Sequence, residues 1–183
     1  MAAFLSHLGD VFMGRTGTGP VDPDQPPFFP VSTPKFIVMS ICTLGIYELY
    51  WFYKNWNLIR QREQTDIMPF WRGFFAFFFC YQCFSRIREH AQSAGVRQSV
   101  AAGPLATGWI ITTVLWKLPD PYWLVSGLAF LFMLPPVAAA NRINAKVLPN
   151  HNPNGRFTAW NWLAIVLGGI LVVLAVIGSF VPD

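Results

Sequence analysis

Long apolar blocks, each separated from the next by a short polar or proline-rich segment, make up most of this chain. Three blocks lie in its second half, at residues 101–118, 121–141 and 158–181. Each holds close to the ~20 apolar residues that a spanning helix needs. Aromatic residues flank the short turn at Pro119 and Asp120, as they do at a headgroup interface. The pattern predicts three firm transmembrane helices, the first two forming an antiparallel hairpin.

The two earlier blocks are less regular. Residues 34–53 stay apolar for about 20 residues behind Thr33, a candidate N-cap, but the segment Thr43–Gly45 is a weak point at their middle. One kinked span and two half-helices are both compatible with this pattern. The block behind Pro69 has an uncharged run of 13 residues, 73–85. Because this run is short for a ~30 Å hydrocarbon core, a span and a re-entrant or interfacial helix remain alternatives.

These blocks predict an all-α integral membrane protein with about four to five hydrophobic helices. Residues 1–33 combine a short amphipathic stretch with a segment dense in Gly and Pro, which is typical of a flexible tail. Residues 34–183 are then a single helical membrane domain. Within it, Pro135 and Pro136 are expected to kink or end a helix, and Thr158 is a candidate cap for the last one.

Composition agrees with a membrane protein. Of the 183 residues, 54% are hydrophobic and 12% are charged, and the mean hydropathy is +0.40, well outside the usual balance of a soluble domain. The net charge of +4 comes from 13 Lys and Arg against 9 Asp and Glu. The basic residues lie beside the apolar blocks and form no single patch, so they indicate topology and anionic headgroups and no nucleic acid.

The basic residues also rank the topologies. If all five blocks span, they divide 8 to 5 between the two sides, which is a weak bias. If the second block alone is re-entrant, they divide 10 to 3. If both earlier blocks enter and leave by one face, the division is 12 to 1, with Lys117 on the far side. The positive-inside rule then places the Pro119–Asp120 turn outside and the loop 142–156 inside.

Glu48 is the candidate functional residue, because a carboxylate in an apolar segment costs several kcal/mol unless it finds a partner, a proton or the interface. If the block is two half-helices, Glu48 lies near the N-terminus of the second, where the helix dipole favours negative charge. Arg72 is the candidate counter-ion in the next block, and we expect a Glu48–Arg72 charge pair. An unpaired interfacial Glu48 and a role in handling protons or substrate are the alternatives.

No recognised catalytic motif is present, so we expect no enzyme and no cofactor. Cys80 and Cys83 have C-x-x-C spacing, but their aromatic surroundings favour packing over redox chemistry, and Cys42 is also apolar in context. The histidines lie far apart without carboxylates at ligand spacing, which predicts no metal site; they are His7, His90 and His151.

The stretch from residue 28 to 75 resembles a group of small bacterial multi-spanning membrane proteins of uncharacterised function. Their shared feature is a T-x-G-[IL]-Y-x-x-Y-W-F-Y-K-x-W box, here the "aromatic box". In this chain it comprises Thr43, Gly45, Tyr47, Tyr50, Trp51, Phe52, Tyr53, Lys54 and Trp56. The resemblance implies a location in the bacterial inner (cytoplasmic) membrane.

The sequence thus predicts a non-enzymatic multi-pass membrane protein that serves as a structural or accessory subunit, or as a lipid-facing scaffold. Its expected partners are membrane lipids with anionic headgroups, together with a membrane protein or a second copy of the chain as alternatives. A small oligomeric transporter or channel is the competing hypothesis, since five short blocks give one subunit too little wall for a pathway.

Overall fold

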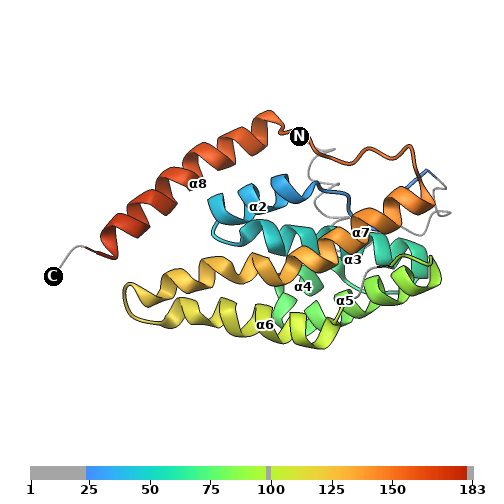
Figure 1. The fold of residues 1–183 in the computed structure, drawn as a ribbon, viewed down its shortest axis with the longest axis horizontal. Helices are drawn as coiled ribbons and strands as arrows, with labels where there is room; N and C mark the ends of the chain where they lie inside the picture. The colour runs from blue at the N-terminus through green and yellow to red at the C-terminus, as the bar shows by residue number, and fades with distance from the viewer. Residues whose placement is uncertain (1–23, 98–99, 181–183) are drawn as a thin grey trace, which may run out of the picture.

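The computed structural model describes residues 24–97 and 100–180, and these form helices without any strand. The amphipathic stretch within residues 1–23 lies outside the described residues. Figure 1 shows most of the helices gathered in one bundle, with α8 along its side, where it contacts α2. The α-helices are α2 (Thr33–Cys42), α3 (Ile46–Glu63), α4 (Pro69–Phe74), α5 (Ala76–Ser93), α6 (Ala102–Val114), α7 (Leu134–Val147) and α8 (Ala159–Gly178). Two 3-10 helices, η1 (Leu115–Lys117) and η2 (Tyr122–Met133), join α6 to α7.

The first apolar block folds as two half-helices, which was one of the two predicted alternatives. The Thr43 hydroxyl donates to the Met39 carbonyl oxygen at 2.7 Å and accepts from the Tyr47 N–H at 3.0 Å, so it links the end of α2 to the start of α3. Leu44 and Gly45 between them have φ of 50° and 85°. Two successive left-handed residues reverse the chain, and glycine supplies one of them without strain.

Both earlier blocks are hairpins whose ends lie at the same end of the bundle. The Arg62 Nη1 atom, in the last turn of α3, donates to the Pro27 carbonyl oxygen at 2.7 Å, so the block ends beside the chain that precedes it. At the end of α5 the His90 ring packs edge-on against Phe28, with ring centroids 5.5 Å apart. The α4–α5 pair therefore also returns to this end.

The later blocks form helices of different lengths. Within residues 24–97 and 100–180, two helices are long and apolar enough, by length and composition, to cross a membrane: Tyr122–Val147, which is η2 continued by α7, and α8. The remaining predicted span, at residues 101–118, is shorter, because α6 has 13 residues and continues only through the 3-10 turn η1.

The predicted helix ends were right in part. Pro135 and Pro136 do not end the helix; they lie in the first turn of α7, where a missing N–H costs little. Thr158 caps α8, as predicted, in a capping box with Asn161.

Two contacts identify the ends of these helices. The Asn154 Nδ2 atom donates to the Pro30 carbonyl oxygen at 3.1 Å, which places the loop after α7 at the end where the early hairpins close. The Trp123 indole N–H donates to the Ser179 hydroxyl at 2.9 Å, which places the end of α8 beside the Pro119–Asp120 turn.

Residues 24–32, here called the N-terminal strap, correct the prediction of a flexible tail up to residue 33. The side chains of Phe28 and Val31 are fully buried. Two side chains of α7 bind their backbone groups, Asn144 at Phe28 and Asn141 at Val31. A Pro-rich segment cannot pair its backbone within a helix, and here asparagine amides do so instead.

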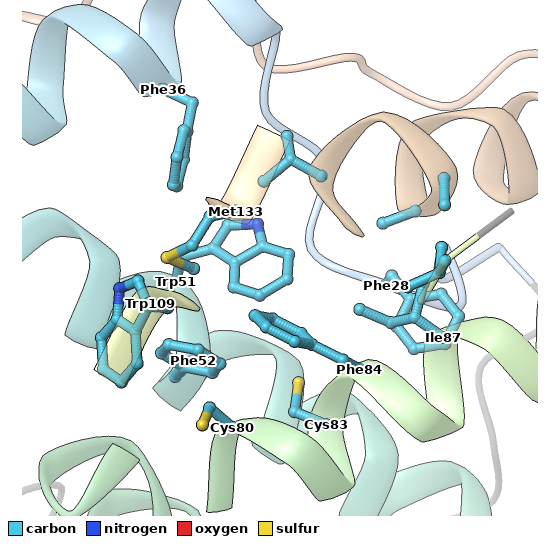
Figure 2. Close-up of a cluster of buried hydrophobic side chains, with 14 of the residues drawn as sticks. Phe28, Phe36, Trp51, Phe52, Cys80, Cys83, Phe84, Ile87, Trp109 and Met133 are labelled. Carbon is cyan, nitrogen blue, oxygen red and sulfur yellow. The ribbon is translucent and has the colours of Figure 1, made fainter. Parts of the chain in front are cut away.

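The core is largely aromatic. Figure 2 shows Trp51, Phe52, Phe84 and Trp109 packed together from α3, α5 and α6. The Phe52 ring lies 5.7 Å from that of Phe84 and 5.2 Å from that of Trp109. Such tilted and edge-on ring pairs each add roughly 0.5–1.5 kcal/mol to the free energy of burial. This cluster fixes the position of Trp109, which borders the site described next.

Candidate functional site

A cavity of about 890 Å³ lies among α2, α3, α6, η2 and α8. Its walls are mostly apolar, with Leu44, Leu49, Phe77, Phe130 and Val176 among the lining residues. Volumes of roughly 300–1,000 Å³ are typical of sites for small molecules. The cavity is therefore large enough for a drug-sized ligand or a lipid chain.

Glu48 lines this cavity from the first turn of α3. Its side chain is 4% exposed, and its Oε2 atom accepts a hydrogen bond of 2.5 Å from the Trp109 indole N–H of α6. The N-terminal end of α3 adds a favourable dipole for negative charge. Glu48 is thus held by a neutral donor and a helix terminus, in the position that the half-helix alternative predicted.

One hydroxyl of the wall, that of Ser40, lacks a partner in the described part of the chain. Ser40 is 3% exposed, and its hydroxyl has no hydrogen-bond partner among the described residues. A buried hydroxyl without a partner costs roughly 1–3 kcal/mol. Farther out, Leu44, Ile46, Trp116 and Leu128 are each at least half exposed, so the cavity opens at the surface of the bundle.

The expected Glu48–Arg72 pair is not formed. Arg72 Nη1 donates to Gln82 Oε1 at 3.3 Å, and its guanidinium lies over the Trp56 ring at 4.6 Å. Trp56 is eight residues beyond Glu48, about 12 Å along α3. Arg72 therefore has an aromatic partner where a carboxylate was predicted, because α4 packs against the middle of α3 and not against its start.

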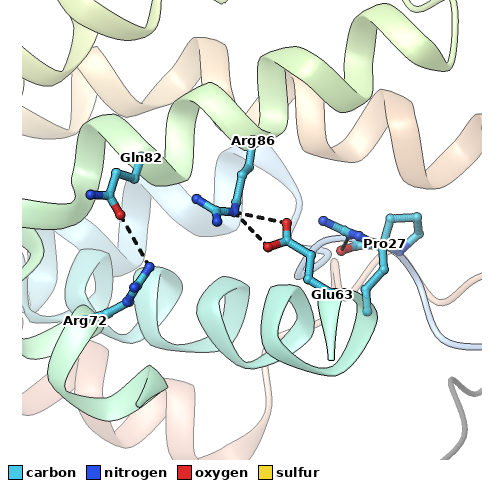
Figure 3. A network of polar contacts seen from close by, with 6 residues as sticks. Pro27, Glu63, Arg72, Gln82 and Arg86 are labelled. Atoms are coloured by element: carbon cyan, nitrogen blue, oxygen red, sulfur yellow. Dashed lines mark hydrogen bonds and ion pairs between the residues drawn. The ribbon is translucent and has the colours of Figure 1, made fainter. Parts of the chain in front are cut away.

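The ion pair that joins the two early hairpins is formed by other residues. Figure 3 shows the Arg86 guanidinium of α5 facing the Glu63 carboxylate at the end of α3, with Arg86 Nε 3.0 Å from Glu63 Oε1. Both side chains are about 30% exposed, at 30% and 31%. A pair at this exposure contributes less than about 1 kcal/mol. It joins the same two blocks as the predicted pair, but at the opposite end of α3 from Glu48.

The aromatic box is divided between the core and the surface. Tyr47, Trp51 and Trp56 are buried, whereas Tyr50 is 42% exposed, with Lys54 Nζ 5.6 Å over its ring. Tyr53 is half-buried. The box therefore holds α3 in the bundle with one face, and Tyr50 is its one exposed member.

The cysteines and His90 give no sign of a second site. Cys80 and Cys83 are fully buried and form no disulfide bond, which is consistent with a packing role. Over residues 24–97 and 100–180, no group of three His, Cys, Asp or Glu side chains could hold a metal ion. Burial, then the nearby Arg62 guanidinium, lowers the pKa of His90, so its ring is neutral at pH 7 and packs on Phe28.

The donor to Glu48 was missed in the sequence. Trp109 follows Glu48 by 61 residues, and a tryptophan in an apolar helix has no pattern that marks it as a hydrogen-bond donor to a carboxylate. A buried carboxylate points first to a cation, but the neutral indole N–H fills the same role here.

The site combines one buried carboxylate, an indole donor and apolar walls, and the lining residues that the structure describes include no basic side chain and no thiol. Such a site can bind a molecule and neutralise a charge on it, but it holds no recognisable nucleophile with an activating base. No family model matches this chain, and no curated protein or solved structure is significantly similar to it.

Proposed function

We propose that this chain is a non-enzymatic, lipid-facing accessory protein of the bacterial inner membrane that holds the apolar part of one small molecule or lipid in the cavity beside Glu48. The observation that supports this most is the 890 Å³ cavity with a buried carboxylate in its apolar wall. Apolar walls with a few placed polar groups are typical of binding sites.

The bundle also supports a particular membrane topology. Both early hairpins close at the end where the loop after α7 lies, as the contact from Asn154 to Pro30 shows. Lys117 lies at the opposite end, in η1. This arrangement corresponds to the 12 to 1 division of basic residues, the strongest positive-inside pattern of the three considered.

We expect single-cysteine labelling in a cysteine-free background to place residue 120 outside and residue 152 inside. The reason is that both positions lie in turns at opposite ends of the two long apolar helices. The measurement is reaction with a membrane-impermeant maleimide in intact spheroplasts. Labelling of residue 152 from the periplasmic side would contradict the proposed topology.

Gly127→Phe should empty the cavity of its ligand. Gly127 lines the cavity, and a Cβ built on it meets no atom within 4 Å, so a larger side chain can extend there without a backbone clash. We expect at least about a threefold fall in the molecule that co-purifies in mild detergent, measured by native mass spectrometry. Gly169→Phe is the matched control, because Gly169 is equally open but lies on α8 outside the cavity lining. Equal ligand content in both variants would refute the proposal.

The oligomeric transporter remains the second candidate, favoured by the position of Glu48 at the start of a half-helix that borders the cavity. Broken helices with ligand-facing termini are a feature of transporters. Flux across reconstituted vesicles that depends on Glu48 would favour it over a holding role.

A further inference from the structure

We propose that the cavity beside Glu48 binds a lipophilic organic cation, such as a quaternary ammonium or phosphonium ion, with the Glu48 carboxylate as its counter-charge. This inference rests on the proposed binding function and specifies the ligand class. It is carried by the charge of the lining, the position of the carboxylate and the aromatic rings around it.

The charge of the lining is one-sided. Among the described residues that border the cavity, Glu48 is the one ionisable side chain, and the ion pair between Arg86 and Glu63 lies elsewhere. The indole of Trp109 donates a hydrogen bond to the carboxylate but carries no charge. A carboxylate buried without a cation is costly, and a bound cation would remove most of that cost.

The carboxylate is accessible from one side. Its Oε2 atom is used by Trp109, whereas the other oxygen, Oε1, lies near Gly45, 3.9 Å from where a Cβ of that glycine would be. Glycine adds no side chain beside Oε1, and both Gly45 and Glu48 line the cavity, so we infer that Oε1 is the oxygen that faces a ligand. A cation can therefore approach the carboxylate without displacing the indole.

Three tryptophans border the same cavity: Trp109, Trp116 and Trp123. The faces of indole rings attract cations, and binding of quaternary ammonium groups is a common use of this attraction. Trp109 and Trp123 are held by hydrogen bonds, to Glu48 and to Asp120 and Ser179 respectively. Trp116 is 61% exposed, with Lys117 Nζ 5.9 Å over its ring, so it is expected to contribute less.

Other ligand classes fit less well. An anionic headgroup would find no basic side chain in the described part of the lining and would face the Glu48 carboxylate. A neutral lipid chain would use the apolar walls but leave the carboxylate without a counter-charge. The basic residues at the other end of the bundle remain available to anionic headgroups.

The test is equilibrium binding of tetraphenylphosphonium to the full-length protein in non-ionic detergent. Tetraphenylborate has the same shape and the opposite charge, so it controls for apolar binding. We expect the cation to bind at least about tenfold more tightly than the anion, and Glu48→Gln to remove this preference. Glu89→Gln, the same change at an exposed position on α5, should leave it intact.

Two further variants guard against misfolding. Glu48→Asp keeps the charge and should retain the preference, and Trp109→Phe removes the donor but keeps the carboxylate, so the cation should still bind. If both ions bind equally and Glu48→Gln changes neither, the cation proposal fails while the apolar cavity stands. If neither ion binds and a neutral apolar dye also fails to bind, the proposed function fails with it.

Discussion

Asn144→Ala is expected to lower the free energy of unfolding by about 2–6 kcal/mol, because it leaves two buried backbone groups without partners. Asn144 Oδ1 accepts from the Phe28 N–H at 3.0 Å, and its Nδ2 donates to the Phe28 carbonyl oxygen at 2.8 Å. Both residues are completely buried, so water cannot replace the amide. The measurement is the unfolding free energy in mixed micelles, together with hydrogen exchange of residues 24–32.

The matched control is Asn150→Ala, at an exposed position in the turn after α7. A surface substitution of this kind usually changes stability by less than about 0.5 kcal/mol. We also expect the amides of the N-terminal strap to exchange faster in Asn144→Ala, since the strap is the segment that the amide holds. If Asn144→Ala costs no more than the control, the strap is held by the burial of Phe28 and not by the amide.

The strap also shows where prediction from the sequence was misled. The segment contains Pro26, Pro27 and Pro30, which are typical of a flexible tail, and this is what the sequence predicted. The missing information was in another part of the chain, because Asn141 and Asn144 of α7 lie 110 and 116 residues beyond their partners. Two asparagines at helical i, i+3 spacing on a buried face require hydrogen-bond partners, and this was the available signal.

The candidate site was predicted in part. The weak point at Thr43–Gly45 and the position of Glu48 behind it follow from local chemistry, because a threonine hydroxyl and a glycine with positive φ act over a few residues. The partner of Glu48 could not be predicted in this way. It depends on how α6 packs against α3. When apolar helices have similar composition, the detailed shapes of their side chains determine which helices pack together, and the sequence pattern does not show this.

The predicted span at residues 101–118 forms a shorter helix than expected, and the reason is again local geometry. Hydropathy counts apolar residues, but the number that form one regular helix depends on local geometry. In the segment 101–118 the α-helix ends at Val114, and the chain continues as the 3-10 turn η1, Leu115–Lys117. Composition alone therefore overestimates how much of this block is available to cross the membrane.

Gly73→Ala is expected to destabilise the protein by about 1–3 kcal/mol or more, the cost of overpacking against a rigid neighbour. A Cβ at this position would lie 2.8 Å from the Tyr53 Cα atom and 2.9 Å from its backbone nitrogen. Backbone atoms of α3 cannot rotate away as a side-chain tip can, so α4 must move as a unit. That movement would also draw the neighbouring Arg72 guanidinium from the ring of Trp56, which it now covers at 4.6 Å.

Gly103→Ala makes the same chemical change in α6, where a Cβ meets no atom within 4 Å. There the substitution should stabilise the protein by up to about 1 kcal/mol, because alanine is the better helix former. The two variants should thus shift the melting temperature in opposite directions in the same detergent. A Gly73→Ala protein that melts at or above the temperature of the parent would show that α4 does not contact α3 as closely as this structure has it.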